Sequence, residues 1–250
     1  MTNGTQNLDN AHSGQITIGA CYKQSISSLF SVRSIATEDC KEWLLFKHYA
    51  KRLCPIEFAF GLFNDKNIME GVMTVGTPVS NTLRNLWNNE YKLMELNRLV
   101  VNENLPKNTL SFFVSQAVKM LPNPLVLVSY ADTSKNHHGY IYQATNWHYT
   151  GLSAKFNDYY VKGMEHLHNG TIMDMSRGKE NRVEWLKQKF GDDLIMIERD
   201  RKHRYFMFLG NKRDKSKMLK MLPYKIENYP KGQNIRYDSS YKPASQLSFF

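Results

Sequence analysis

The feature that most constrains this fold is a continuous apolar run, from Leu125 to Val128, that ends abruptly in polar residues. A run without polar alternation is typical of a strand buried on both faces, in the middle of a mixed or parallel sheet. The polar segment that follows extends from Ser129 to Ser134. Because open α/β sheets bind ligands beyond the carboxyl ends of such strands, this segment predicts a ligand-binding crevice.

A short helix is predicted just after that strand, beyond a turn that ends at Gly139. Tyr142 and Asn146 are four residues apart, so they would share one face of this helix. With Asp132 they would place a phenol, an amide and a carboxylate around one crevice. Asp132 suits a proton acceptor or a hydrogen-bond partner of an amino group, or else it caps the following turn. Tyr142 suits a proton donor, or else it is a core tyrosine with a hydrogen-bonded hydroxyl.

The chain as a whole predicts an α+β or α/β protein with a mixed central sheet flanked by helices. The expected elements are a strand within 15–32, a helix at 37–53, a hairpin at 56–75, a strand at 91–101, a helix at 109–120, the strand and helix already described, strands at 148–156 and 158–167, a helix at 181–190, strands at 194–197 and 205–209 around a basic turn at 199–204, and a basic helix at 212–222. The strand–loop–helix–strand–helix core resembles GNAT-type acyltransferases, although many α+β folds share this order.

Length and composition limit the class of protein. The 250 residues suit a disordered tail at 1–14, a catalytic domain at 15–210 and a basic C-terminal segment at 211–250 that packs on the domain or extends from it. No apolar run approaches the ~20 residues needed to cross a bilayer, and the N-terminal segment lacks the apolar stretch of a secretory signal. Three cysteines, an odd number, favour a reducing cytoplasm over a disulfide framework.

The net charge of +10 is concentrated near the C-terminus. Between residues 199 and 242 there are 13 Lys and Arg against four Asp and Glu, whereas the rest of the chain is nearly neutral. Tyrosines and phenylalanines are interleaved with these basic residues. The pattern favours an acidic partner, most commonly a nucleic acid, over a merely solubilising surface. The basic residues expected to contact phosphates or DNA are Arg201, Lys202, Arg204, Lys212 and Arg213.

Four further residues are candidates for the crevice. Tyr130 and Tyr149 offer aromatic faces to a flipped base, or else they pack in the core. Arg98, in the middle of a strand, suits contact with a phosphate or carboxylate, or an ion pair with a neighbouring acid. His48 lies on the apolar side of the first expected helix, where a hydrogen-bonded core histidine is commoner than a catalytic one. No metal-ligand spacing points to a zinc site, and spacing alone leaves a mononuclear iron site open.

Several longer phrases carry a family resemblance. ELNRLVV, SFFVSQA, LVSYADTS, GYIYQATNWHYTG and KHRYFMFLG, in this order and spacing, resemble the phage Mom family of DNA-modification proteins. The resemblance extends from about Ile56 to Lys231, and GYIYQATNW is its most specific part. It implies a GNAT-like fold and the addition of a methylcarbamoyl group to N6 of adenine, which shields phage DNA from host restriction. It also implies that Asp132 and Tyr142 are the family's important acid and tyrosine. The weaker matches are His48, Arg98 and Ser111.

The resemblance leaves the group donor open. Acyltransferases of this type usually carry glycines before the first core helix, where backbone N–H groups close on the pyrophosphate of coenzyme A. Here the corresponding loop, 101–109, has no glycine and one acid. The helix start at Ser111, with Lys107 and Asn108 before it, still suits an anionic group. A CoA-type acyl donor and a donor of another class are therefore both compatible with the sequence.

The function expected from the sequence is a transferase that modifies adenine N6. Its partners are double-stranded DNA, with the adenine flipped out, and a small-molecule group donor, but no membrane. A GNAT-type N-acetyltransferase on a small amine or protein is one alternative, and it would bind acetyl-CoA tightly and ignore DNA. A non-catalytic DNA-binding protein is the other, and it would leave DNA composition unchanged. We expect a cytoplasmic location, in the host cell if a phage encodes the chain, and the oligomeric state is open.

Overall fold

The computed structural model describes residues 25–78, 80–87, 90–167, 169–233, 241 and 243. The expected tail at 1–14 and the start of the first expected strand lie outside the described residues, as does most of the segment after 233. Within the described part, no helix is both long and apolar enough to cross a membrane.

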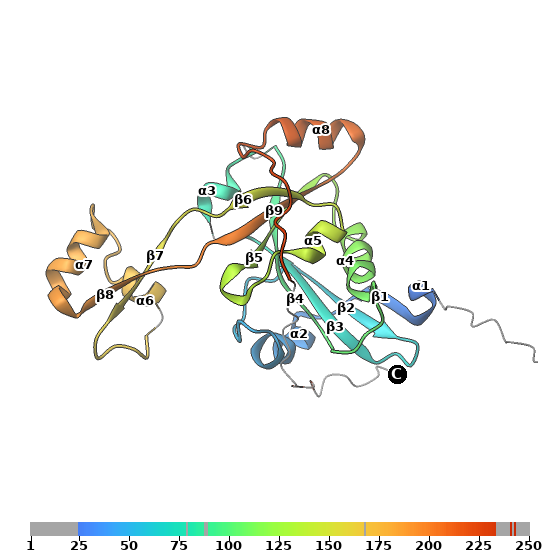
Figure 1. The fold of residues 1–250 in the computed structure, drawn as a ribbon, viewed down its shortest axis with the longest axis horizontal. Coiled ribbons are helices and arrows are strands. Elements are labelled where there is room, and N and C mark those ends of the chain that lie inside the picture. Colours follow the sequence, from blue (N-terminus) through green and yellow to red (C-terminus); the bar gives the residue numbers. More distant parts are fainter. Residues whose placement is uncertain are drawn as a thin grey trace, which may run out of the picture.

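A mixed seven-stranded sheet forms the centre of the molecule (Figure 1). Its strands, in spatial order, are β1 (Phe30–Ser34), β2 (Phe58–Asn64), β3 (Met69–Gly76), β4 (Leu93–Val101), β5 (Leu125–Asp132), β9 (Lys202–Leu209) and β6 (His148–Leu152). Only β4 and β5 pair in parallel, and every other pair in this sheet is antiparallel. Helices pack on both faces, which confirms the predicted fold class.

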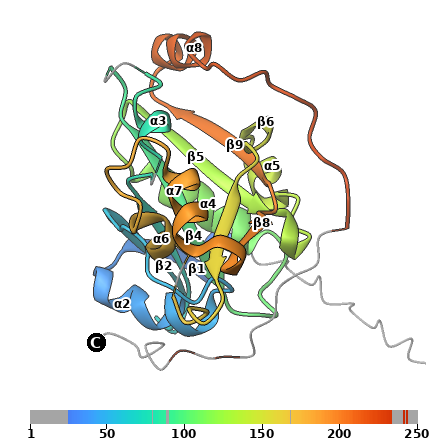
Figure 2. The same cartoon turned by 90° about the vertical axis from the view of Figure 1, so that its left-hand side faces the viewer.

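The two faces of the sheet are covered by different helices. On one face, α4 (Thr109–Lys119) and α5 (Tyr140–Ala144) pack over the odd-numbered residues of β5, and α1 (Ile26–Leu29) borders them. On the other face, α3 (Asn81–Arg84) and α8 (Lys212–Lys220) flank the even-numbered residues of β5. We call these the α4 face and the α8 face. Figure 2 shows α8 at one end of the sheet and α2 (Thr37–Glu42) at the other.

The two parallel strands separate partway along their length, and we call the point of separation the notch. β4 and β5 pair only from Leu93 to Glu95, and beyond Glu95 they diverge. The register between β3 and β4 shifts at this point, which leaves Asn97 as an extra residue in β4. The Asn97 side chain accepts a hydrogen bond from Thr74 and donates one to the Pro55 carbonyl, so the irregularity is held in place. Ser129 bridges the diverging strands by donating to the Leu96 carbonyl at 2.7 Å.

The first helix is shorter than expected. It was predicted to run to residue 53, but α2 ends at Glu42 and continues as one π-helical turn, η1 (Trp43–Lys47). His48 follows in an extended conformation. The wider turn directs Lys47 into the protein, where its side chain is 1% exposed. Its ammonium group donates to both carboxylate oxygens of Glu103, at 2.7 and 2.9 Å, and to the Tyr241 carbonyl.

This buried ion pair gives a stability prediction. Replacing Glu103 by glutamine removes the carboxylate charge that faces the buried Lys47 ammonium, and removing one partner of a buried pair costs about 3 kcal/mol. We expect a loss of that order in the free energy of unfolding, measured by urea denaturation. The double variant Lys47→Met/Glu103→Gln should recover most of it, because it removes the buried charge as well. A Glu103→Gln protein as stable as the wild type would contradict this account.

An arm projects from the sheet between β6 and β9 (Figure 1). It consists of β7 (Asn157–Val161), α6 (Asn169–Asp174), α7 (Arg182–Phe190), the short η3 (Gly191–Asp193) and β8 (Leu194–Glu198). It has its own apolar cluster, which includes Tyr159, Ile172 and Leu186. The sequence placed a basic turn at 199–204 between two neighbouring strands, which is wrong, because β8 pairs with β7 and β9 begins at Lys202.

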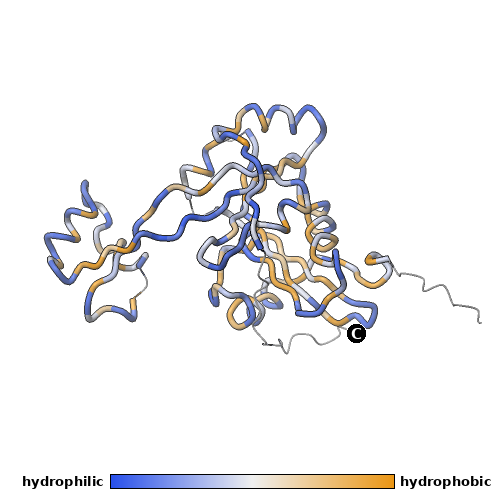
Figure 3. The backbone as a smooth tube through the Cα atoms, viewed as in Figure 1, coloured by the Kyte–Doolittle hydropathy of each residue, from blue (hydrophilic) through white to orange (hydrophobic). Residues whose placement is uncertain are grey.

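After α8 the chain returns across the far edge of the sheet. The Glu227 amide donates to the Tyr149 carbonyl at 2.9 Å, and the Tyr229 hydroxyl donates to the Trp147 carbonyl at 2.8 Å. Gln143 in α5 donates to the Pro230 carbonyl. The segment 221–233 therefore packs along β6 and α5. Figure 3 shows how hydrophilic α8 is compared with the central strands.

Candidate active site

Tyr142 lies on the α4 face of the notch. Its side chain is buried, and its hydroxyl is 2.7 Å from the Ser129 hydroxyl. Ser129 has one hydroxyl hydrogen, which it gives to the Leu96 carbonyl, so Tyr142 donates to Ser129. Burial raises the pKa of Tyr142, and the nearby Glu95 carboxylate adds to this rise. The phenol is therefore protonated at working pH, and it lies next to Ser129, where β4 and β5 separate.

Asp132 ends β5 on the opposite face. Its Oδ1 accepts hydrogen bonds from the amide and the hydroxyl of Ser134, and its Oδ2 is 3.4 Å from Lys202 Nζ. Partial burial acts to raise the pKa of this carboxyl, but the Ser134 bonds and the Lys202 charge lower it below its ordinary value. Asp132 is thus ionised, and it caps the η2 turn (Thr133–Lys135), as one of the two sequence interpretations expected.

The expected common crevice for Asp132, Tyr142 and Asn146 is not formed. Successive residues of β5 alternate between the two faces, and Ser129 and Asp132 are three residues apart, so Tyr142 and Asp132 lie on opposite faces. Asn146 lies beyond the end of α5, with a left-handed backbone and an exposed side chain, so it does not share a helical face with Tyr142. Any contact between the two groups must pass through the notch.

Glu95 is a carboxylate that the sequence interpretation missed as a site residue. It is the last β4 residue paired with β5, and it lies on the α8 face beside Val128. Burial raises the pKa of its carboxyl against the opposing charges of Arg98, Lys202 and Arg52. Its only sequence signal is a charged residue between the apolar residues Met94 and Leu96.

His48 and Arg98 border the same notch. His48 is buried and accepts a hydrogen bond from the Ala50 amide. Burial, with the charge of Arg98 and neighbouring cations, lowers the pKa of His48 to about 3, so the imidazole is neutral at working pH. Arg98 donates to the Asn97 carbonyl at 2.6 Å, and its Nε is buried without a hydrogen-bond partner in the described part of the chain. Tyr49, which the sequence interpretation also missed, stacks on His48.

The two candidate aromatic residues lie on different faces. Tyr130 is half-buried on the α8 face, and burial and the Glu95 charge raise its pKa. Tyr149 is buried on the α4 face, and its hydroxyl lies 2.8 Å from His203 Nδ1. Its ring packs against Tyr205 within the core. Tyr130 therefore shares a face with Asp132 and Glu95, whereas Tyr149 is a core residue in this conformation.

The five basic candidates fall into two groups. Arg201 donates to the carbonyls of Ser153 and Leu152, Arg204 donates to Thr150 and stacks on Tyr224, and Lys202 pairs with Asp132. Each of these three side chains therefore has a partner within the protein. Their contact with phosphate stays a prediction. Lys212 and Arg213 are exposed in the first turn of α8.

Helix α8 lies on the α8 face of the sheet with its basic side outward. Its buried Met218 packs against the sheet, and the Met218 carbonyl accepts a hydrogen bond from the Trp87 indole at 3.0 Å. A capping box at Asn211 and Asp214 fixes the start of the helix. Helix α8 therefore lies on the same side of the sheet as Tyr130, Asp132 and Glu95, near the start of β5, while Asp132 ends that strand. The cations that α8 exposes are Lys212, Arg213, Lys215 and Lys220.

Comparison with known proteins identifies the family. The model of the Mom protein family matches residues 29–231, most of the chain. The chain belongs to the Mom family. The resemblance seen in the sequence is thereby confirmed. Methylcarbamoylase mom of Escherichia phage Mu is 28% identical over 193 residues, which cover 74% of this chain and 77% of that protein.

Solved structures similar to this Mom family member include acetyltransferases. A GNAT-family acetyltransferase from Bacillus cereus has 12% identity and a TM-score of 0.39, with 73% of this chain and 99% of that one covered. The spermidine/spermine N-acetyltransferase SpeG from Vibrio cholerae has 9% identity and a TM-score of 0.41, with 78% and 98% covered.

The loop at residues 101–109 of this Mom family member has no glycine, but two of its asparagines adopt a glycine-like backbone. Asn104 and Asn108 take the left-handed backbone conformation that glycine usually supplies. The acid in the loop, Glu103, is paired with Lys47, so its charge is balanced. The first-turn amides of α4, at Leu110 and Ser111, have no intrahelical acceptor, and Lys107 is exposed beside them. These groups fit an anionic part of a donor.

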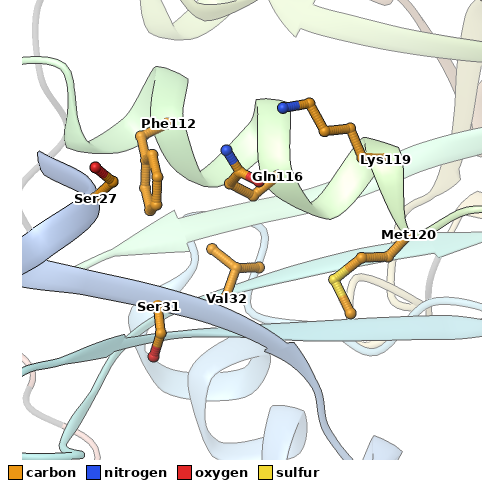
Figure 4. Close-up of a pocket in the computed structure, with 7 residues that line it drawn as sticks. All are labelled: Ser27, Ser31, Val32, Phe112, Gln116, Lys119 and Met120. Atoms are coloured by element: carbon orange, nitrogen blue, oxygen red, sulfur yellow. The ribbon is translucent and has the colours of Figure 1, made fainter.

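Metal sites and cavities outside the notch complete the description. Among the described residues, no group of three or more His, Cys, Asp and Glu could hold a metal ion. A hollow of about 330 Å³ lies between the N-terminal segment and α4 (Figure 4). Its lining residues are Ser27, Ser31, Val32, Phe112, Gln116, Lys119 and Met120. None of these belongs to the notch, so the hollow is separate from the candidate active site.

Proposed function

We propose that this member of the Mom family is a transferase that adds a methylcarbamoyl group to N6 of adenine in DNA, protecting phage DNA from host restriction. Family membership supports a DNA-modification role, and the relative from phage Mu is named for the methylcarbamoyl transfer. The donor is a small molecule with an anionic part that fits the start of α4.

The observation that carries the proposal is that α8, with its exposed cations, lies on the same side of the sheet as Tyr130, Asp132 and Glu95. A helix rich in lysine and arginine attracts and positions the phosphate backbone without reading the sequence. An adenine in a duplex must be flipped out before its amino group can react, and Tyr130 offers it an aromatic face. DNA bound along α8 would therefore deliver the base from the α8 face.

Asp132 and Tyr142 have different roles in the proposed reaction. The adenine amino group is a poor nucleophile because its lone pair is delocalised into the ring, so it benefits from a hydrogen-bond acceptor such as ionised Asp132. The protonated hydroxyl of Tyr142, on the opposite face, would serve the donor carbonyl or the leaving group after it releases its hydrogen bond to Ser129. In this arrangement the amine and the donor approach the notch from different faces of the sheet.

Nucleoside mass spectrometry tests the proposal. Plasmid DNA from cells that express the protein should contain deoxyadenosine with the added mass of a methylcarbamoyl group, and DNA from empty-vector cells should not. Unmodified DNA despite confirmed expression would reject the proposed function. Tight binding of acetyl-CoA without DNA binding would then favour the N-acetyltransferase alternative, and DNA binding without modification would favour a non-catalytic DNA-binding protein.

A further inference from the structure

We propose that the outer edge of β8, in the arm, is the interface through which two copies of this protein form a dimer. In this dimer, β8 of one copy pairs antiparallel with β8 of the other, about a two-fold axis that passes Met196. The interface lies in the arm, so the proposal does not depend on the proposed function.

Strand β8 exposes apolar side chains to an unusual degree. Ile195, Met196 and Ile197 follow one another and are 39%, 56% and 53% exposed. Elsewhere in the described chain, large exposed apolar residues do not occur in consecutive positions. The arm projects away from the central sheet (Figure 1), so the sheet leaves these side chains uncovered. Single exposed apolar residues are ordinary, whereas a contiguous group marks an interaction surface.

The two faces of the β7–β8 ribbon differ. Tyr159 and Val161 of β7 pack against residues of α6 and α7. Tyr159 directly opposes Met196, so the even-numbered residues of β8 point to the side of the helices. Alternation along the strand directs Ile195 and Ile197 to the opposite, open face. A ribbon of two strands is only marginally stable by itself, and further strands stabilise it.

The backbone of β8 has hydrogen-bonding groups along its outer edge. Antiparallel partners alternate between pairs that exchange backbone hydrogen bonds and pairs that do not. The Arg199 amide donates to the Phe156 carbonyl at 2.8 Å, and the Lys162 amide donates to the Asp193 carbonyl at 3.0 Å, so the odd-numbered residues of β8 bond to β7. The even-numbered residues therefore direct their amides and carbonyls outward, and no described strand pairs with them. Such an edge is a template for another strand.

The outer edge of β8 is complementary to itself. In the two-fold arrangement, the outward groups of the even-numbered residues in one copy meet those of the other copy. Ile195 lies opposite Ile197 of the second copy on the open face, and by symmetry this apolar contact occurs twice. At each end, exposed Asp193 lies opposite Arg199 of the second copy, which is half-exposed beside its own Asp158. Opposite charges at these positions favour this register.

The size of the interface indicates a weak dimer. Each copy contributes the five residues of β8, with three half-exposed apolar side chains at the centre. Pairing two such edges buries roughly 900 Å² in total, which is at the low end for specific interfaces. We therefore expect a dimer that dissociates at micromolar concentrations, and a second copy is the partner whose edge matches in both hydrogen bonding and charge.

Sedimentation velocity on the full chain tests the dimer. Between about 1 and 100 µM, the wild type should shift from a 29.2 kDa monomer toward twice that mass. Ile195→Lys/Ile197→Lys should stay monomeric, because it places charges against apolar side chains of the second copy. Leu219→Lys/Ile226→Lys is the matched control, with the same added charge at positions 39% and 43% exposed, and it should dimerise like the wild type.

A cysteine at the axis tests the register without adding charge. Directly opposite residues in a hydrogen-bonded pair have Cα atoms about 5.5 Å apart, a separation that a disulfide can span. Met196→Cys should therefore form covalent dimers on mild oxidation, seen on a non-reducing gel. Leu219→Cys, exposed on α8, is the control. It should form no more covalent dimer than the wild type, which has three cysteines of its own.

Each outcome bears on the proposal. A wild type that stays monomeric at about 100 µM overturns it, and so does a wild-type dimer that the arm and control variants weaken equally. If the double-lysine arm variant fails to fold, judged by circular dichroism, the cysteine variants decide, and Met196→Cys that links no better than Leu219→Cys overturns the interface. A monomeric wild type whose arm variant binds a labelled DNA duplex less tightly than the control variant would assign this surface to DNA instead.

Discussion

Replacing Asp132 by asparagine is expected to abolish DNA modification in a protein that remains folded. Asparagine cannot supply the negative charge that accepts a hydrogen bond from the amino group, and it leaves Lys202 without its partner beside the site. Loss of a positioned acid–base group costs typically 10²–10⁴-fold in rate. Mass spectrometry of plasmid nucleosides should therefore show a drop in modified adenine of at least about 100-fold.

The fold should tolerate this substitution. Asp132 caps the η2 turn by accepting from the Ser134 amide, and asparagine caps such turns about as well as aspartate. Its ion pair with Lys202 is partly exposed, where such pairs contribute about 1 kcal/mol or less. Asp65→Asn, in the exposed turn between β2 and β3, is the matched control. Wild-type modification by Asp132→Asn would remove Asp132 from the mechanism.

The central strand was predictable because one physical requirement dominates it. Four consecutive apolar residues, Leu125 to Val128, fit only where both faces are covered, and all four are buried between helices on the two faces of the sheet. The change to polar residues after Val128 marked the point where β4 moves away and pairing stops. The change from apolar to polar residues is visible in the local sequence, so this part of the site could be inferred.

The direction of each site side chain was not predictable in the same way. Which face Tyr142 occupies depends on α5 crossing over Ser129 and ending at Ala144, and both depend on packing against Trp147 and Tyr205. The helical spacing of Tyr142 and Asn146 carried no information on where the helix ends. Glu95 was missed for a similar reason, because its significance comes from the shift in register of β4 rather than from its neighbours in sequence.

Counting charges in the basic C-terminal region does not show which basic side chains are exposed. The count includes α8, which exposes its cations because a capping box and a buried Met218 orient the helix. It could not separate these residues from Arg201 and Arg204, which donate to backbone carbonyls of the strand beside them. That distinction depends on the pairing of β9 with β6, across the inserted arm, and long-range pairing leaves no local signal.

Reversing the charge of Lys212, Arg213 and Lys215 is expected to weaken DNA binding strongly. If each contacts one phosphate, the slope of log affinity against log salt should become shallower by about 3, since each contact contributes about 0.9. The three new negative charges also repel the backbone, so we expect a loss of roughly 100-fold or more in affinity at low salt. Fluorescence anisotropy with a labelled duplex, titrated at several salt concentrations, measures both quantities.

Helix α8 should survive this triple substitution. Lys212 and Arg213 lie in its first turn, where acidic side chains interact favourably with the helix dipole, and all three side chains are exposed. Glutamates at Lys179, Lys187 and Lys189, exposed on the arm, give a control with the same change in net charge. If α8 binds the phosphates, only the α8 variant changes the salt slope substantially. An equal effect of both variants would mean that net charge alone attracts DNA, and an unchanged slope in the α8 variant would place the DNA-binding surface elsewhere.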